Sequence, residues 1–217
     1  CAGNWGGMIP ESNCDTVSDI DGNTYKTIKI GEQWWMAENL KVTHYRNGDE
    51  IPTGFKDDEW VALSTGAYTF YNTDSSNIAI YGNLYNWYTI DDSRGICTEN
   101  WHVPTEEDWS ILSDYLGGDD VAGRKMKSTG TIEKGDGLWY SPNTATNESG
   151  FTGYPGGYRH ISDGLYYHLG NTGNFWTSTD ESYTDFAFYR VLFWNYDYVH
   201  NIAHTKNYGF SIRCIKD

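Results

Sequence analysis

The sequence predicts an α+β fold, and three observations support this class. One amphipathic helix is clearly marked over residues 105–117. From Gly153 onward, apolar and polar residues alternate as they do in strands that are buried on one face. The chain also holds 10 Trp, 18 Tyr and 24 Gly, a mixture that suits short strands and packed loops better than a helical bundle.

The helix over 105–117 carries its own start and stop signals. Thr105 is a suitable N-cap, and Asp108 three residues later resembles the acidic partner of a capping box. Acidic residues in the first turn are favoured by the helix dipole, and two glycines follow the last turn. The apolar residues recur at spacings that place them on one face: Trp109, Leu112 and Leu116.

The N-terminal region is expected to form a β-hairpin over 15–35. Residues 24–30 alternate as in a strand, and residues 19–23 hold the Asp, Gly and Asn that turns favour. The carboxylates of this turn lack the spacing of a calcium-binding EF-hand loop, because no Glu follows at the twelfth position. We therefore predict a turn and not a metal site.

The middle of the chain carries weaker patterns. We expect a short helical turn over 37–41, a helix start over 57–63, a strand over 67–71, a polar loop over 72–77, a short helix or tight turn over 81–88 and a second, basic helix over 121–127. Gly, Ser, Asn and Thr recur over 128–150, which predicts a long ordered loop. Such loops often carry function.

The last third of the chain reads as a series of strands. The predicted strands cover 154–159, 165–169, 175–179 and 186–194, a returning segment covers 195–206, and a closing strand covers 208–215.

The charge balance restricts the partners. Fifteen Lys and Arg residues stand against 30 Asp and Glu, so the formal net charge is -15. This charge argues against binding to nucleic acid or to an anionic membrane surface. It is compatible with neutral glycans, proteins or divalent cations.

Four cysteines in a chain of this size indicate an oxidising compartment. Three pairings are open, and no C-x-x-C motif suggests a redox or zinc site. We favour Cys97–Cys214, which would close a long loop between the start of the helix and the last strand. Cys1 and Cys14 then form the second pair.

The first residue allows an alternative to that second pair. A mature bacterial lipoprotein begins with a cysteine that carries lipid on its sulfur, so Cys1 is a candidate for lipidation, with 1–13 as a tether. No apolar run is long enough to span a membrane. We expect an extracellular protein or one on the bacterial outer-membrane surface, with membrane contact only through a lipid on Cys1.

Several blocks of sequence resemble one family. The stretch Trp-His-Val-Pro-Thr-Glu-Glu-Asp-Trp at 101–109 is similar to the signature of the Fibrobacter succinogenes major paralogous domain family. Further similar blocks follow the same order at 21–40, 81–87, 147–159, 175–179 and 209–214. The resemblance implies one C-type-lectin-like domain over 14–217, with short helices on small twisted sheets, related to formylglycine-generating-enzyme-type domains. It implies no particular activity.

The segment over 186–207 is the leading candidate for a ligand surface. It mixes flat aromatic rings with short polar side chains, as sugar-binding surfaces and protein paratopes do. The alternative is a hairpin whose aromatic rings fill the core, with alternate residues divided between the two roles. The predicted ligand residues are Trp194, Asn195, Tyr196, Asp197, Tyr198 and His200.

A structural calcium ion is the one cofactor that the composition suggests. Asp136, Asn147 and Glu148 lie in the long loop and offer the oxygen ligands that calcium prefers. The Glu-Pro-Asn and Gln-Pro-Asp motifs of sugar-binding C-type lectins do not occur, which argues against a calcium-dependent sugar site. Histidines 102, 160, 168, 200 and 204 show no zinc-binding pattern.

We predict no catalytic residues, because none of the common nucleophile, metalloprotease or phosphate-binding motifs occurs. The sequence favours a non-catalytic module of a bacterial surface protein that binds a glycan or a surface protein. Two alternatives stay open: a structural or assembly subunit of a cell-surface complex, in which the protein is oligomeric, and a polysaccharide hydrolase.

Overall fold

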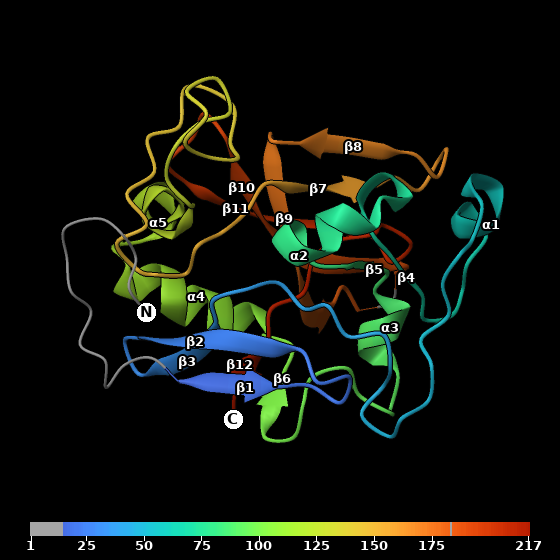
Figure 1. Cartoon of the computed structure of the whole chain (residues 1–217). Coiled ribbons are helices and arrows are strands. Elements are labelled where there is room, and N and C mark those ends of the chain that lie inside the picture. The colour runs from blue at the N-terminus through green and yellow to red at the C-terminus, as the bar shows by residue number, and fades with distance from the viewer. Residues whose placement is uncertain (1–14, 183) are drawn as a thin grey trace.

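The computed structural model describes residues 15–182 and 184–217, and it shows short helices packed on small curled sheets (Figure 1). Within these ranges two sheets have five strands and a third has two. The predicted α+β class is therefore confirmed. The predicted tether over 1–13 and the pairing of Cys1 with Cys14 lie outside the described residues.

The lower sheet in Figure 1 joins the N-terminal hairpin to the end of the chain. The predicted hairpin over 15–35 is confirmed, and so is its turn. The carboxylate of Asp19 accepts hydrogen bonds from the backbone of Asp21 and Asn23, so the turn itself uses this acidic group. In spatial order the strands are β1 (Thr16–Ser18), β2 (Thr24–Ile30), β3 (Gln33–Met36), β12 (Ile215–Lys216) and β6 (Trp101–His102).

The upper sheet contains the strands predicted in the last third of the chain. Neighbouring strands are antiparallel except for one parallel pair, β7 with β9. In spatial order they are β11 (Val199–Thr205), β10 (Phe186–Phe193), β9 (Thr172–Asp180), β7 (Gly156–Arg159) and β8 (Tyr166–Leu169). Because β11 is an edge strand, one side of its backbone has no neighbour in this sheet.

The predicted central helix is α4 (Glu106–Tyr115), which lies above the lower sheet in Figure 1. Thr105 caps it, and the reciprocal capping box with Asp108 is present. The basic helix is α5 (Asp119–Met126). No helix within the described residues is long and apolar enough to cross a membrane. The remaining helices are α1 (Asp57–Val61), α2 (Ile78–Tyr81) and α3 (Tyr88–Asp91).

Two local predictions in the middle of the chain were wrong. Residues 37–41 form no helical turn, because the backbone N–H of Leu40 donates to Ile212 across the molecule. The predicted polar loop over 72–77 forms 3-10 turns that continue into α2. The carboxylate of Asp74 caps the second of these turns, a local signal that the polar composition masks.

Two strand assignments also differ from the prediction. The segment over 81–88 contains β5 (Leu84–Tyr85), which pairs with β4 (Tyr68–Thr69). The segment over 208–215 does not close the upper sheet as a regular strand. It makes isolated bridges to β7 and β9 of the upper sheet and to β5, and its last residue begins β12 of the lower sheet.

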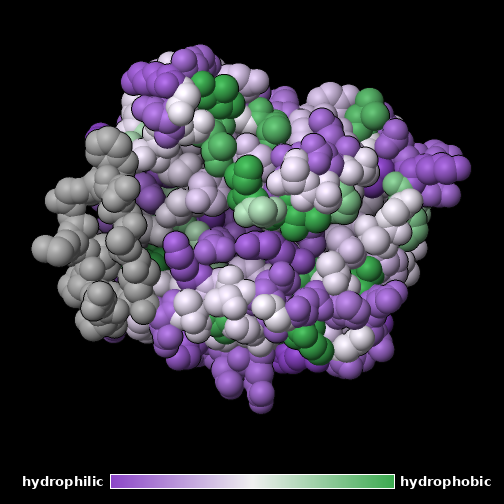
Figure 2. Space-filling model, viewed as in Figure 1, coloured by the Kyte–Doolittle hydropathy of each residue, from purple (hydrophilic) through white to green (hydrophobic). Residues whose placement is uncertain are grey.

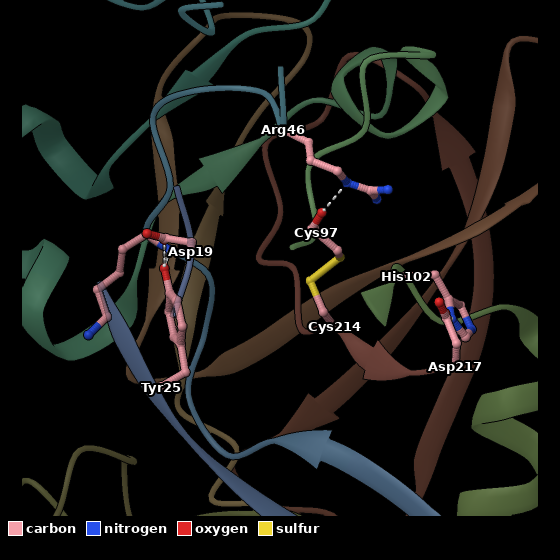
Figure 3. Close-up of a disulfide and its surroundings, with 8 residues drawn as sticks. Asp19, Tyr25, Arg46, Cys97, His102, Cys214 and Asp217 are labelled. Atoms are coloured by element: carbon pink, nitrogen blue, oxygen red, sulfur yellow. Dashed lines mark hydrogen bonds and ion pairs between the residues drawn. A yellow bond between two sulfur atoms is a disulfide. The ribbon is translucent and has the colours of Figure 1, made fainter. Parts of the chain in front are cut away.

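The favoured disulfide, Cys97–Cys214, is present and joins residues 117 positions apart in the chain (Figure 3). The same backbone is held by hydrogen bonds on both sides. The Arg46 Nε donates to the Cys97 carbonyl at 2.9 Å, and the Met36 N–H donates to the Cys214 carbonyl at 3.0 Å. The bridge thus fixes the loop before α4 to the lower sheet.

Two apolar clusters fill the interior. The first lies under β9 and β10 on the side of the disulfide, and its bulkiest members include Trp87, Trp101, Trp176, Tyr189 and Phe210. The second lies between α4, α5 and the two sheets, and it includes Trp35, Trp109, Met126, Phe151, Phe175 and Leu192. The face of α4 predicted from sequence is buried in this second cluster.

We predict that replacing both Cys97 and Cys214 by alanine lowers the free energy of unfolding by about 2–4 kcal/mol, because the unfolded chain regains the freedom of a long loop. Urea titration followed by tryptophan fluorescence measures this change. The matched control replaces Cys1 and Cys14 instead and leaves this bridge intact. An unchanged midpoint in the Cys97 and Cys214 variant would contradict the prediction.

Candidate functional site

The predicted ligand segment forms the turn and the return strand of one β-hairpin. Strands β10 and β11 flank the turn of residues 194–198. They pair in a regular antiparallel register, from Phe186 opposite Thr205 to Leu192 opposite Val199. Because the register is regular, alternate residues of β11 point to opposite faces of the sheet.

The hairpin divides the predicted ligand residues between its two faces. Trp194 is partly buried and packs against the second apolar cluster, into which Val199 is also buried. Tyr198 and His200 alternate with Val199 and therefore lie on the other face, where both are half-buried. Tyr196, in the turn, is exposed. Trp194 therefore packs toward the core, whereas the neighbouring rings of Tyr196, Tyr198 and His200 reach solvent.

Four aromatic rings stand together at the end of the hairpin, and we call Phe193, Tyr196, Tyr198 and His200 the tip cluster. The Tyr196 and Tyr198 rings are stacked, with centroids 4.7 Å and planes 18° apart. The His200 ring lies 4.3 Å from Tyr198 and 5.5 Å from Phe193. Such rings offer flat apolar area with polar edges at low entropic cost, since each has few rotatable bonds.

Polar side chains of the turn lie beside the tip cluster. Asn195 is exposed and Asp197 is half-buried. The Thr144 hydroxyl, from the long loop over 128–150, donates a hydrogen bond to the Asp197 carboxylate. The turn therefore combines aromatic faces with amide and carboxylate groups that can bind hydroxyl groups of a ligand.

A buried lysine holds the backbone of the turn in place. Lys127 is fully buried, and its ammonium group donates hydrogen bonds to the carbonyls of Phe193 at 2.9 Å and Tyr196 at 2.7 Å. The carbonyl of Trp194 lies at 3.4 Å. Burial lowers the pKa of Lys127 to about 8. The cation replaces the solvent that these carbonyls would otherwise need.

Helix α5 supports the turn from the same side. The Arg124 N–H donates to the Asp197 carbonyl at 3.0 Å. At Gly123 a side chain would not fit, because a Cβ there would lie 2.5 Å from the Tyr198 carbonyl. The glycine thus allows the helix and the turn to approach closely, which keeps the tip cluster in a fixed position.

A second group of rings was missed as a site from the sequence, and we call it the flank cluster. His204 lies 4.2 Å from Tyr208, and Tyr208 lies 5.7 Å from Tyr158, with distances taken between ring centroids. The signal was present in part, because His200 and His204 occupy alternate positions on one strand face. The rest required knowing which segments meet. The flank cluster comprises Tyr158, His160, Tyr167, His168, His204 and Tyr208.

The three predicted calcium ligands each have a partner of their own. Asp136 accepts a hydrogen bond from the backbone of Thr131, and Asn147 exchanges hydrogen bonds with Thr152. Glu148 forms an ion pair with a lysine of α5 at 3.1 Å. Over 15–182 and 184–217, no group of three or more His, Cys, Asp or Glu residues is arranged to hold a metal ion.

A shallow cleft of about 230 Å³ lies beside the disulfide, between the turn after β1 and the loop that contains Cys97. Figure 3 shows that its polar groups point at the protein itself: Arg46 reaches the Cys97 carbonyl, and Asp19 binds the Tyr25 hydroxyl. The cleft is smaller than the roughly 300–1,000 Å³ of most ligand pockets. We therefore rank it below the tip cluster.

Exposed aliphatic side chains occupy a different part of the surface. Figure 2 shows apolar residues over α2 and the loop of residues 128–150, whereas hydrophilic residues dominate over the lower sheet. Ile80, Ile132 and Tyr140 are among the exposed apolar residues. Ile132 and Tyr140 both lie against Gly170. Charged residues of the same loop, Glu133 and Lys134, are exposed next to Ile132.

We predict that Lys127→Met lowers the free energy of unfolding by about 1–3 kcal/mol, because buried carbonyls of the turn lose their donor. Urea titration measures the loss, and amide hydrogen exchange over 193–198 localises it. Lys125→Met is the matched control. This neighbour is partly exposed and pairs only with Glu148, so its loss costs less than about 1 kcal/mol. Equal effects of the two variants would contradict the assignment.

The pH dependence gives a second check on Lys127. Its pKa is about 8 in the folded protein against 10.5 for the ordinary side chain, so the unfolded chain binds more protons between these values. The contribution of Lys127 to the free energy of unfolding therefore increases as the pH rises from about 8 to 10.5. This slope should be absent from Lys127→Met.

The comparisons with known proteins give one result. No curated protein and no solved structure matches this chain. The family model described as the Fibrobacter succinogenes major domain matches residues 28–216, which include the helix α4, both large sheets apart from β1 and the start of β2, and the hairpin that carries the tip cluster. The chain therefore belongs to the Fibrobacter succinogenes major domain family.

Proposed function

We propose that this protein is a non-catalytic binding module of a bacterial surface protein, which recognises a glycan or another surface ligand through the tip cluster. The observation that carries the proposal is the stacked pair of Tyr196 and Tyr198, which reaches solvent although its backbone is held by Lys127 and α5. Aromatic rings that serve only to fill the core would be buried. A rigid stack of this kind suits the apolar face of a sugar ring.

The chemistry around the tip cluster supports the same proposal. Asn195 and Asp197 supply hydrogen-bonding groups beside the rings, as sugar hydroxyls require. The ammonium group of Lys127, which contacts the turn, is buried and occupied by carbonyls, so it offers no charge to a ligand. The carboxylate of Asp197 and the net charge of -15 favour neutral ligands over acidic ones.

The fold and the disulfide support the proposed location. The short helices, curled sheets and long loops suit a C-type-lectin-like domain. A disulfide between Cys97 and Cys214 persists in oxidising surroundings such as the periplasm or the cell exterior. We therefore propose that the protein acts outside the cytoplasm, with lipidation of Cys1 as a candidate anchor.

We predict that replacing Tyr196 and Tyr198 together by alanine abolishes binding to glycans on a broad array and to insoluble plant polysaccharides. The stacked pair provides the flat contact area, so its loss removes the main apolar contact. Trp194 is left in place because it also packs against the core. Tyr115→Ala is the control, since Tyr115 is 66% exposed but lies on α4. Undiminished binding by the double variant would refute the proposed site.

The same binding measurement, made with and without EDTA, tests a role for calcium. We expect binding to survive EDTA, because it depends on aromatic rings. Binding lost in EDTA and restored by calcium would instead implicate the loop that contains Asp136, Asn147 and Glu148.

A second candidate function is that of an assembly subunit in a surface complex. The exposed apolar residues Ile132 and Tyr140 favour it, because aliphatic side chains bind protein partners without requiring sugar hydroxyls. We predict that a chain with this role self-associates, and that Ile132→Ser reverses the association. Light scattering over a wide concentration range measures the mass. A monomer at every concentration would exclude assembly with copies of itself.

A further inference from the structure

We infer that the ligand is an extended, neutral polysaccharide chain, which lies along β11 from the tip cluster to the flank cluster. This inference rests on the proposed function, and it adds the length, the charge and the path of the ligand. It depends on four observations: the strand face that joins the two clusters, the buried floor of the flank cluster, the carboxylates at both ends of the path, and the length of the path.

The two clusters are joined along one face of one strand. His200, Ile202 and His204 occupy alternate positions of β11, where they pair with Val191, Tyr189 and Ala187 of β10. All three are half-buried, and Ile202 packs against the first apolar cluster. Since β11 is the edge strand, this row lies at the margin of the sheet, where each of the three side chains is partly exposed.

The flank cluster extends this row onto a broad aromatic floor. Tyr208 is 7% exposed and forms the floor, with the His160 ring 5.3 Å away on one side and the His204 ring 4.2 Å away on the other. Tyr158 and His168 lie 5.3 Å apart beyond it. These rings come from four separate segments of the chain, so the surface exists only in the folded protein.

The backbone at His168 supports a role for this floor. Its φ angle is 64°, in the left-handed region that residues other than glycine rarely occupy. This conformation brings the exposed imidazole next to the ring of Tyr158 on β7. Tyr158 is paired with Tyr167, the residue before His168. Unusual backbone conformations of this kind are found often at binding sites.

Carboxylates lie at both ends of the path. Asp163 accepts a hydrogen bond from the Tyr167 hydroxyl at 2.7 Å, and Asp197 lies at the other end of the row. Burial lowers the pKa of His204, and its Nδ1 accepts a hydrogen bond from the Thr205 N–H at 2.9 Å, so the neutral ring offers its Nε2–H as a donor to a hydroxyl group. A path bounded by carboxylates repels an acidic chain and accepts hydroxyl groups.

The length of the path indicates a polymer. His204 is six positions after Tyr198, which corresponds to about 20 Å along a β-strand. That length exceeds a disaccharide and is spanned by several consecutive pyranose rings. The row of His200, Ile202 and His204 follows one extended strand, so it matches an extended chain better than a coiled one.

The test is the dependence of affinity on chain length. The full chain is titrated calorimetrically with three neutral series: cello-oligosaccharides, xylo-oligosaccharides and malto-oligosaccharides, from disaccharide to hexasaccharide. We expect the Kd for one extended series, cello- or xylo-, to fall by about tenfold or more with length, equivalent to about 1.4 kcal/mol. The coiled malto- series should show no such gain.

Variants then locate the gain on the path. We expect His204→Ala and Tyr167→Ala each to remove the gain with length while leaving disaccharide binding at the tip unchanged. Tyr196→Ala should weaken binding at every length. Tyr115→Ala on α4 is the control for a change of exposed aromatic surface, and the urea midpoint of each variant reports whether it folds. The length series is measured on the unaltered protein, so its result does not depend on whether a variant folds.

The outcomes separate this inference from the proposed function. Equal affinity for short and long chains, lost in Tyr196→Ala, would leave the tip as a single-sugar site and overturn the path along β11. A preference for acidic over neutral glycans on the array would overturn the neutral character of the ligand. Binding by none of the three series and by nothing on the array would overturn the inference and the proposed function together.

Discussion

The guanidinium of Arg213 is the group on which the arrangement of the two sheets depends. It is fully buried, and it donates to the Asn39 side chain at 2.8 Å, to the Thr152 carbonyl at 2.8 Å and to the Phe151 carbonyl. It also lies 4.1 Å from the centre of the Phe151 ring. Burial lowers its pKa to about 9, so at neutral pH the cation is retained. A buried charge costs several kcal/mol unless it is fully hydrogen-bonded, so these acceptors must stay where they are.

The segment that carries Arg213 passes between the sheets and contacts both. Phe210 bridges to Tyr85, and Ser211 bridges to Phe175 of β9. Two residues beyond Ser211, the chain enters Arg213, then the disulfide, then β12 of the lower sheet. The hydrogen bonds of Arg213 and the neighbouring disulfide together fix one short stretch of backbone. Both apolar clusters form against this stretch, on its opposite sides.

The same division into two sides explains why the hairpin can present rings to solvent. Arg190 of β10 is buried and pairs with Glu106 of α4 at 3.1 Å, and Asn201 of β11 binds the same carboxylate. These contacts attach one face of the hairpin to α4. The opposite face of the hairpin packs on the first apolar cluster, and this packing ends at the edge strand β11. His200, Ile202 and His204 therefore remain half-exposed, with their backbone already ordered.

Local patterns were sufficient to predict the helix α4 and the strands of the upper sheet, and tertiary contacts decided several of the other elements. The helix α4 followed from Thr105, Asp108 and the spacing of its apolar residues, because a capping box and an amphipathic face are properties of adjacent residues. The strands of the upper sheet followed from alternation. The hydrogen bond from Leu40 to Ile212 could not be predicted, since no local pattern indicates a partner so far along the chain.

The candidate site shows the same limit in finer detail. The sequence identified the aromatic and polar residues of the turn. The alternation of residues along the segment predicted that they would be divided between ligand contact and core packing. Which role fell to Trp194 depended on the position of the second apolar cluster. The flank cluster depended on four segments meeting, with Tyr208 as their common neighbour. Composition detects the surplus of rings in this chain, but only the fold determines which of them share a surface.

Rigidity and charge together determine what such a surface can select. Lys127 and Gly123 hold the turn before any ligand arrives, so binding need not order the backbone and loses little conformational entropy. Stacking on rings discriminates poorly among sugars, because many pyranoses have an apolar face. Discrimination must then come from the polar margins and from repulsion. In the proposed role, the net charge of -15 and the carboxylates at both ends of the path would repel polyanions, and the polar margins would discriminate among the neutral chains that remain.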